Sequence, residues 1–96
     1  YRNHLNIKIH EVQNYLVHNI SGETSISNLA LLANMSPRNL TRLFKQTTGI
    51  TVNQYVTLLR SETAKTLLRN PDNNLAFIAS RCGFKTARQL QRILKQ

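Results

Sequence analysis

The amino-acid sequence predicts an all-α domain of about six helices, in which a long helix joins two similar helical units. Three observations carry this prediction. Apolar residues recur at helical spacing, and no segment alternates polar and apolar residues over a useful length. Capping and turn-forming residues divide the chain into short segments. The second half of the chain also repeats a pattern of the first half at a fixed offset of 50 residues.

The repeat consists of basic and apolar positions. The basic pairs are Arg38 with Arg88, Arg42 with Arg92, and Lys45 with Lys95. The apolar pairs are Leu40 with Leu90, Leu43 with Ile93, and Phe44 with Leu94. Each segment predicts a short helix, a tight turn and a second helix with a basic outer face. This is the pattern of a helix-turn-helix, and two such units indicate two contacts with a nucleic-acid duplex.

The first unit is expected to span residues 5–49 and to begin with an amphipathic helix. The apolar face of this helix is formed by Leu5, Ile9, Val12, Leu16 and Ile20. A loop follows at residues 21–24, and Ser25 is a plausible cap for a helix over residues 26–33. Asn34 then suits the left-handed conformation that ends many helices.

Ser36-Pro37 predicts the start of the second helix of this unit, because Ser caps well and Pro at the first position loses no hydrogen bond. Gly49 is expected to end it. The long helix spans residues 51–69, with Thr51 or Asn53 as its cap, and the turn at 70–73 ends it.

The second unit is expected to span residues 74–96. Asn74 can cap a helix over residues 75–82, and Gly83 takes the place that Asn34 has in the first unit. Thr86 can cap the last helix, which we expect to be still running at Gln96. The small residues before both turns, Ala30 with Ala33 and Ala79 with Cys82, suit a close approach of helices.

The charge of the chain lies almost entirely in one part of it. The net charge is +9, and residues 1–37 are neutral, whereas residues 38–96 carry eleven Lys or Arg against Glu62 and Asp72. The electrostatic field of this positive charge raises the local concentration of a polyanion, although the charge also favours solubility. The sequence therefore favours a nucleic-acid partner.

Other chemistry has little support in the sequence. Cys82 is the one cysteine, so no internal disulfide can form, and a buried structural role fits it better than a reactive thiol. The three histidines and four acidic residues form no zinc-site spacing and no paired-carboxylate pattern. No apolar run reaches the ~20 residues that a membrane span needs. We therefore expect no enzyme activity, no cofactor, no metal and no membrane contact.

Two alternatives to duplex DNA remain, namely RNA and an acidic protein partner. The major groove of an RNA duplex does not admit a helix, and single-strand readers use exposed aromatic platforms. The chain has six aromatic residues, of which Phe44, Tyr55, Phe77 and Phe84 fall at expected core positions. Duplex DNA is therefore the favoured partner.

These residues resemble the DNA-binding domain of AraC/XylS-type bacterial transcription regulators. The resemblance covers about residues 5–96 and rests on the segments 36–45, 49–51 and 55–68, with Ile78-Ala79 and Cys82-Gly83-Phe84. By length, residues 1–96 are one domain, and the resemblance implies that it binds DNA with two recognition helices that read successive major grooves. The second unit departs from the family pattern, because Leu90 and Leu94 replace aromatic residues, and the family usually continues into a further short helix.

The resemblance also implies the residues of the site. The candidates for base contact are Arg38, Asn39, Thr41, Arg42, Ala87, Arg88, Gln91 and Arg92. The candidates for phosphate contact follow instead from charge and from the expected helix starts, and they are Ser36, Lys45, Lys85, Thr86 and Lys95.

The resemblance implies partners as well. Double-stranded DNA is the expected partner and RNA polymerase a further candidate, with a cytoplasmic, nucleoid-associated location. The sequence starts at Tyr1 and not at a methionine. If it is a piece of a longer protein, a sensing or dimerisation domain N-terminal to it is a further candidate.

Overall fold

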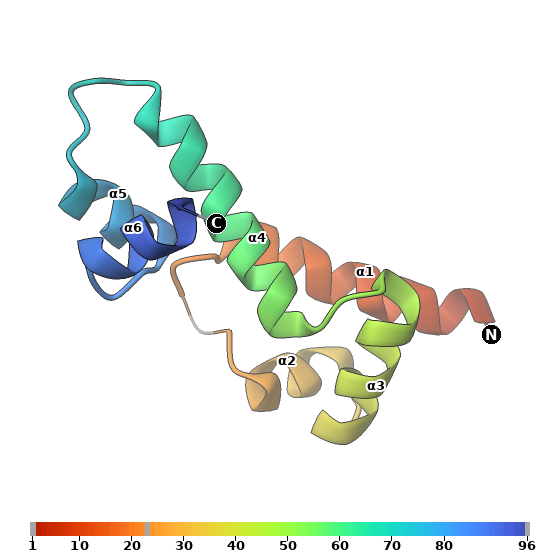
Figure 1. The fold of residues 1–96 in the computed structure, drawn as a ribbon. Helices are drawn as coiled ribbons and strands as arrows, with labels where there is room; N and C mark the ends of the chain where they lie inside the picture. The colour runs from red at the N-terminus through yellow and green to blue at the C-terminus, as the bar shows by residue number, and fades with distance from the viewer. Residues whose placement is uncertain (1, 23, 96) are drawn as a thin grey trace.

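The computed structural model describes residues 2–22 and 24–95, and within them it contains six helices and no strand (Figure 1). The helices are α1 (Arg2–His18), α2 (Ile26–Ala33), α3 (Pro37–Thr48), α4 (Val52–Leu68), α5 (Leu75–Cys82) and α6 (Ala87–Leu94). The all-α prediction is confirmed. The predictions for Glu23, for Gln96 and for the side chain of Leu5 lie outside the described part of the chain.

Polar side chains start five of the six helices at the residues that the sequence predicts. In each case the side chain accepts a hydrogen bond from the backbone N–H three residues further on, which satisfies one of the unpaired donors of a helix start. These caps are Ser25, Ser36, Thr51, Asn74 and Thr86. At Thr51 the cap is reciprocal, because Gln54 Oε1 accepts from the Thr51 N–H at 2.9 Å.

Two helix ends differ from the prediction. The first helix ends at His18 and not at Ile20, because the side chains of Asn19 and His18 bond the carbonyls of Tyr15 and Asn14, each at 2.8 Å. The last helix ends at Leu94, and Lys95 caps it.

The turns inside the two units share one geometry. Asn34 and Gly83 adopt the left-handed conformation, with φ of 55° and 89°. The next residue in each turn, Met35 or Phe84, donates its N–H to the carbonyl five residues back, at 3.0 Å and 2.8 Å. This Schellman arrangement ends α2 and α5 alike. The second turn is one residue longer, because α5 ends at Cys82 and α6 starts at Ala87.

Two separate buried clusters hold the units together. The first cluster joins α1, α2, α3 and the start of α4, and its largest fully buried side chain is that of Phe44. The second cluster joins the far half of α4 to α5 and α6, and it contains Ala64, Ile78, Ala79, Cys82, Phe84 and Leu90. Phe77 does not belong to either cluster. The prediction that it is a core residue is wrong, because its side chain is 48% exposed.

The helix α4 spans the molecule and places the two units towards opposite ends (Figure 1). Helices α1, α2 and α3 contact one another, and α5 and α6 contact each other and α4. The result is an elongated body of 48 × 20 × 19 Å.

Candidate nucleic-acid interface

The outer face of α3 carries the predicted residues of the first unit. Arg38, Asn39, Thr41, Arg42 and Lys45 are all exposed. Leu40 and Phe44 on the opposite face are fully buried, and Leu43 packs against them. Burial of this face fixes the rotation of the helix about its axis, so the basic face must point to solvent.

Two hydrogen bonds within α3 limit what its polar side chains can offer. Asn39 Oδ1 accepts from Arg42 Nη2 at 3.3 Å, which ties together two candidates for base contact. Thr41 Oγ1 donates to the Pro37 carbonyl at 2.9 Å. Because its hydrogen is used there, Thr41 presents to a base only an acceptor oxygen and a methyl group.

The outer face of α6 is similar but shorter. Arg88, Gln91 and Arg92 are exposed on it, and Lys95 follows directly after its last turn. Ala87 is half-buried, so it offers less surface than its neighbours. The helix has eight residues, whereas α3 has twelve.

Gln89 shows why the two units are not interchangeable. It is the counterpart of Asn39, but its Oε1 accepts from the Lys85 N–H at 2.9 Å and so closes the turn before α6. The same side-chain position therefore serves the outer face in one unit and the turn in the other.

The starts of α3 and α6 suit an anion. Ser36 and Thr86 accept from the N–H groups of Asn39 and Gln89, both at 3.1 Å, so their hydroxyl hydrogens remain available as donors. The positive end of the helix dipole adds to this preference. Lys85 is exposed one residue before Thr86. Ser36, Lys85 and Thr86 are therefore exposed at or beside these two helix starts, and their contact with phosphate stays a prediction.

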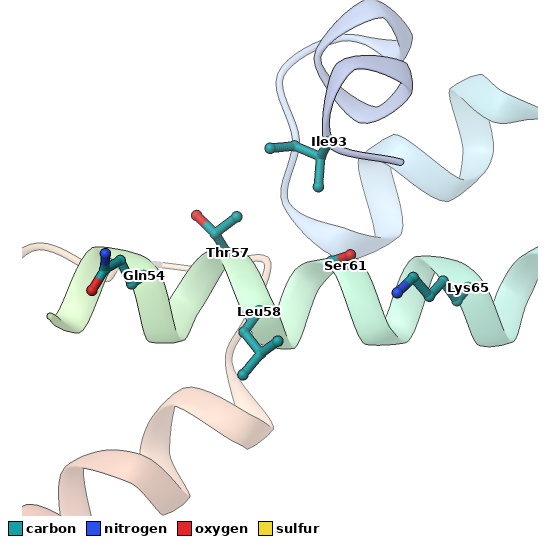
Figure 2. A pocket seen from close by; sticks show the side chains of 6 residues that line it. All are labelled: Gln54, Thr57, Leu58, Ser61, Lys65 and Ile93. Atoms are coloured by element: carbon teal, nitrogen blue, oxygen red, sulfur yellow. The ribbon is translucent and has the colours of Figure 1, made fainter. Parts of the chain in front are cut away.

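A shallow groove of about 220 Å³ lies between α4 and α6. Figure 2 shows Ile93 of α6 facing the side of α4 that carries Thr57 and Ser61. Gln54 and Lys65 lie at the two ends of the groove. Gln54 takes part in the cap of α4, and Lys65 forms a 3.5 Å ion pair with Glu62. No polar or charged side chain of the described residues is buried, so none of the groove's polar side chains is a buried group for a small ligand.

Three observations concern other kinds of site in the described part of the chain. No group of three or more His, Cys, Asp or Glu side chains within it could hold a metal ion. None of its helices combines the length and the apolar character that crossing a membrane requires. Burial raises the pKa of the Cys82 thiol, and the nearby Arg60 and Arg81 lower it by less. A thiol that is buried and less acidic than usual is a weak nucleophile.

Arg60 belongs to the segment 55–68 that carries the family resemblance, but no sequence pattern predicts the contact that it makes from the middle of α4. Its Nε donates to the carbonyl of Ile20 at 2.8 Å, across 40 residues of sequence. Burial lowers the pKa of its guanidinium, and the nearby Cys82 raises it by less. A half-buried arginine on an otherwise amphipathic helix is a weak signal, and the sequence gives no way to recognise its partner.

The two units that this geometry describes match a family of known domains. A family model described as a helix-turn-helix domain matches residues 29–96. This chain belongs to the AraC/XylS-type helix-turn-helix family. The match covers the turns of both units, their recognition helices α3 and α6, and the helix α4 between them, whereas α1 lies outside it.

Relatives of this AraC/XylS-type domain are transcription regulators by name. It is 39% identical over 71 residues to the "HTH-type transcriptional regulator Rv1931c" of Mycobacterium tuberculosis. It is 35% identical over 77 residues to the "HTH-type transcriptional activator RhaS" of an Enterobacter species. These matches cover 74% and 80% of the chain but only 27% and 28% of the relatives. The chain thus spans little more than a quarter of their length.

Solved structures of AraC-type domains have the same fold. The DNA-binding domain of AdpA, solved in complex with a target DNA, is 28% identical and superposes with a TM-score of 0.84, over 91% of this chain and 78% of that one. An AraC-type regulator from Chromobacterium violaceum is also 28% identical, with a TM-score of 0.85 over 94% and 80% of the two chains.

Proposed function

We propose that this domain binds duplex DNA sequence-specifically as part of a bacterial transcription regulator and not as an enzyme. The recognition helices α3 and α6 enter successive major grooves. One observation carries the proposal: two capped helices present arginines at equivalent positions, and buried faces fix the rotation of both. The 48 Å length of the body is sufficient to reach two grooves that lie about 34 Å apart.

The exposed side chains of the two helices supply the chemistry of base reading. Arg42 and Arg92 can each donate two hydrogen bonds to guanine, and Gln91 can pair with adenine. Arg38, Asn39, Thr41, Ala87 and Arg88 complete the base-facing set. Asn39 holds Arg42 through its 3.3 Å bond, which reduces the side-chain entropy that Arg42 loses on binding.

Phosphate contacts are expected to supply much of the affinity. Ser36 and Thr86 donate from their hydroxyls at the helix starts, where Lys85 adds positive charge beside Thr86. Lys45 and Lys95 add positive charge at the other ends of α3 and α6. Such contacts carry no sequence information, but they fix the register of the protein on the duplex.

The test is a gel shift with duplex DNA and with single-stranded RNA over a salt series. With ~6 phosphate contacts, the logarithm of the duplex affinity should fall against log salt with a slope near −5. Arg42→Ala with Arg92→Ala in one chain should remove sequence preference. Binding to RNA at equal strength, or a slope near zero, would contradict the proposal.

We also infer a larger context for the domain. The relatives are three to four times longer than the matching segment, which supports a sensing or dimerisation domain N-terminal to this one. One relative is named a transcriptional activator, which supports contact with RNA polymerase in the cytoplasm, at the nucleoid. Sequencing of the flanking gene and transcription in vitro with purified polymerase test these two inferences.

A further inference from the structure

The relative position of the two units depends on few contacts. Their buried clusters are separate, and the helix α4 is the element that contributes to both. A single helix can bend gently along its length, so α4 alone does not fix the direction of α6 relative to α3. A second connection lies at the middle of α4, where Arg60 meets Ile20 and Gly83.

Arg60 bonds the end of the first unit's leading helix. Its Nε donates to the Ile20 carbonyl at 2.8 Å, just beyond the end of α1. The side chain is only partly buried, and no described acidic group pairs with it. A guanidinium next to the C-terminal end of a helix is favoured by the negative end of the helix dipole.

Gly83 brings the turn of the second unit against the same point. A Cβ atom built on Gly83 would lie 2.5 Å from the Ile20 carbonyl oxygen, 2.9 Å from Arg60 Nε and 2.9 Å from Ser21 Cα. The backbone of the turn between α5 and α6 therefore packs directly on the Ile20–Arg60 bond. The Arg60 side chain thus lies between the end of the first unit's leading helix and the turn of the second unit, near Cys82 of the second cluster.

The partners of Arg60 differ from those expected of an arginine that contacts DNA. Arg60 Nε is used by a backbone carbonyl, whereas the exposed arginines of α3 and α6 point to solvent. Its neighbours are the ends of α1 and α5, not the starts of the recognition helices.

We propose that Arg60 is a positioning residue that sets the separation and direction of the two recognition helices. The inference rests on the proposed two-groove binding. If the junction opens, each unit can still bind its own groove, but the second unit no longer lies where its groove is. The gain that comes from linking two binding events is then reduced.

The experiment compares Arg60→Met with Arg69→Met, which removes the same charge from the exposed end of the same helix. The DNA probe is a duplex that the wild-type chain selects from a random library. The same duplex with either protected segment scrambled gives two half-site probes. In parallel, spin labels at Gln46→Cys and Ala76→Cys, with Cys82→Ala, report the distance between α3 and α5 without DNA.

Arg60→Met should weaken binding to the whole duplex about tenfold and to each half-site by less than about twofold. Its spin-label distance distribution should broaden, whereas Arg69→Met should keep the wild-type distribution. Equal losses on whole and half duplexes would make Arg60 a DNA contact, and an unchanged distribution would show that α4 alone sets the geometry. Either result overturns the proposal.

Two further outcomes are possible. If Arg60→Met does not fold, Arg60→Lys replaces it, because lysine keeps the charge and a donor but loses the fixed direction of Nε. The same broadening and the same loss on the whole duplex are then expected, to a smaller extent. If the wild type binds the whole duplex no more tightly than a half-site, two-groove binding is wrong. The spin-label distances still test whether Arg60 positions the two units, because they are measured without DNA.

Discussion

Gly49 and Gly83 form a matched pair for a stability measurement. Both have positive φ, 85° and 89°, so an alanine at either position loses roughly 1–2 kcal/mol to backbone strain. A Cβ on Gly49 would have no atom within 4 Å, whereas one on Gly83 would lie 2.5 Å from the Ile20 carbonyl oxygen. That oxygen is backbone and cannot rotate away, so Gly83→Ala should lose about 1–3 kcal/mol more through overpacking.

The assay is urea denaturation followed by circular dichroism, supported by thermal melts. Gly49→Ala should unfold with a free energy lower by about 1–2 kcal/mol, and Gly83→Ala lower by about 2–5 kcal/mol. Because about 4–8 °C of Tm correspond to 1 kcal/mol in a domain of this size, the two variants should melt at clearly separate temperatures. Gly22→Ala is the control, because its Cβ would meet only ordinary contacts at 3.5 Å and beyond. Equal losses at Gly49 and Gly83 would refute the close approach of the two units at this point.

The remaining predictions concern binding and reactivity. Arg42→Ala and Arg92→Ala should each lose about 1–3 kcal/mol and relax specificity at one base pair, whereas Lys45→Ala should weaken all sequences alike and lower the salt slope by ~1. Affinities for a panel of single-base operator variants distinguish base contact from phosphate contact. A loss of affinity that is uniform across the panel would make both arginines phosphate contacts. In hydroxyl-radical footprinting, the segment bound by the first unit should be protected more strongly, since α6 has eight residues against twelve in α3; equal protection would argue against this. Cys82 is fully buried, so iodoacetamide should modify the native protein only at the rate of local opening. Rapid modification in native buffer would show that the thiol is accessible.

Features that depend on neighbouring residues could be predicted from the sequence. Ser36 caps α3 because its hydroxyl reaches an N–H three residues away, and Gly83 ends α5 because few other residues adopt its φ. Such local chemistry gave the order of the helices, most of their bounds and the exposed basic faces.

Features that depend on tertiary packing could not be predicted from the sequence. Phe77 lies in an apolar helix whose buried side is taken by Ile78, Ala79 and Cys82, and the sequence does not show how far that side extends. The bond from Arg60 to Ile20 joins residues 40 apart that share no pattern. The end of α1 was also set by contacts of the Asn19 and His18 side chains with backbone carbonyls.

The division of the core into two clusters has a consequence for how the chain folds. Most helix contacts join elements that are close in sequence, such as α2 with α3 and α5 with α6, and proteins rich in local contacts fold fast. The second cluster is the smaller one, with six buried residues, so we expect it to open at a lower free energy than the first. Amide protons of α6 should then exchange before those of α3. A duplex bound to α6 would slow this exchange, because a ligand that binds only the closed form of the second unit stabilises that form.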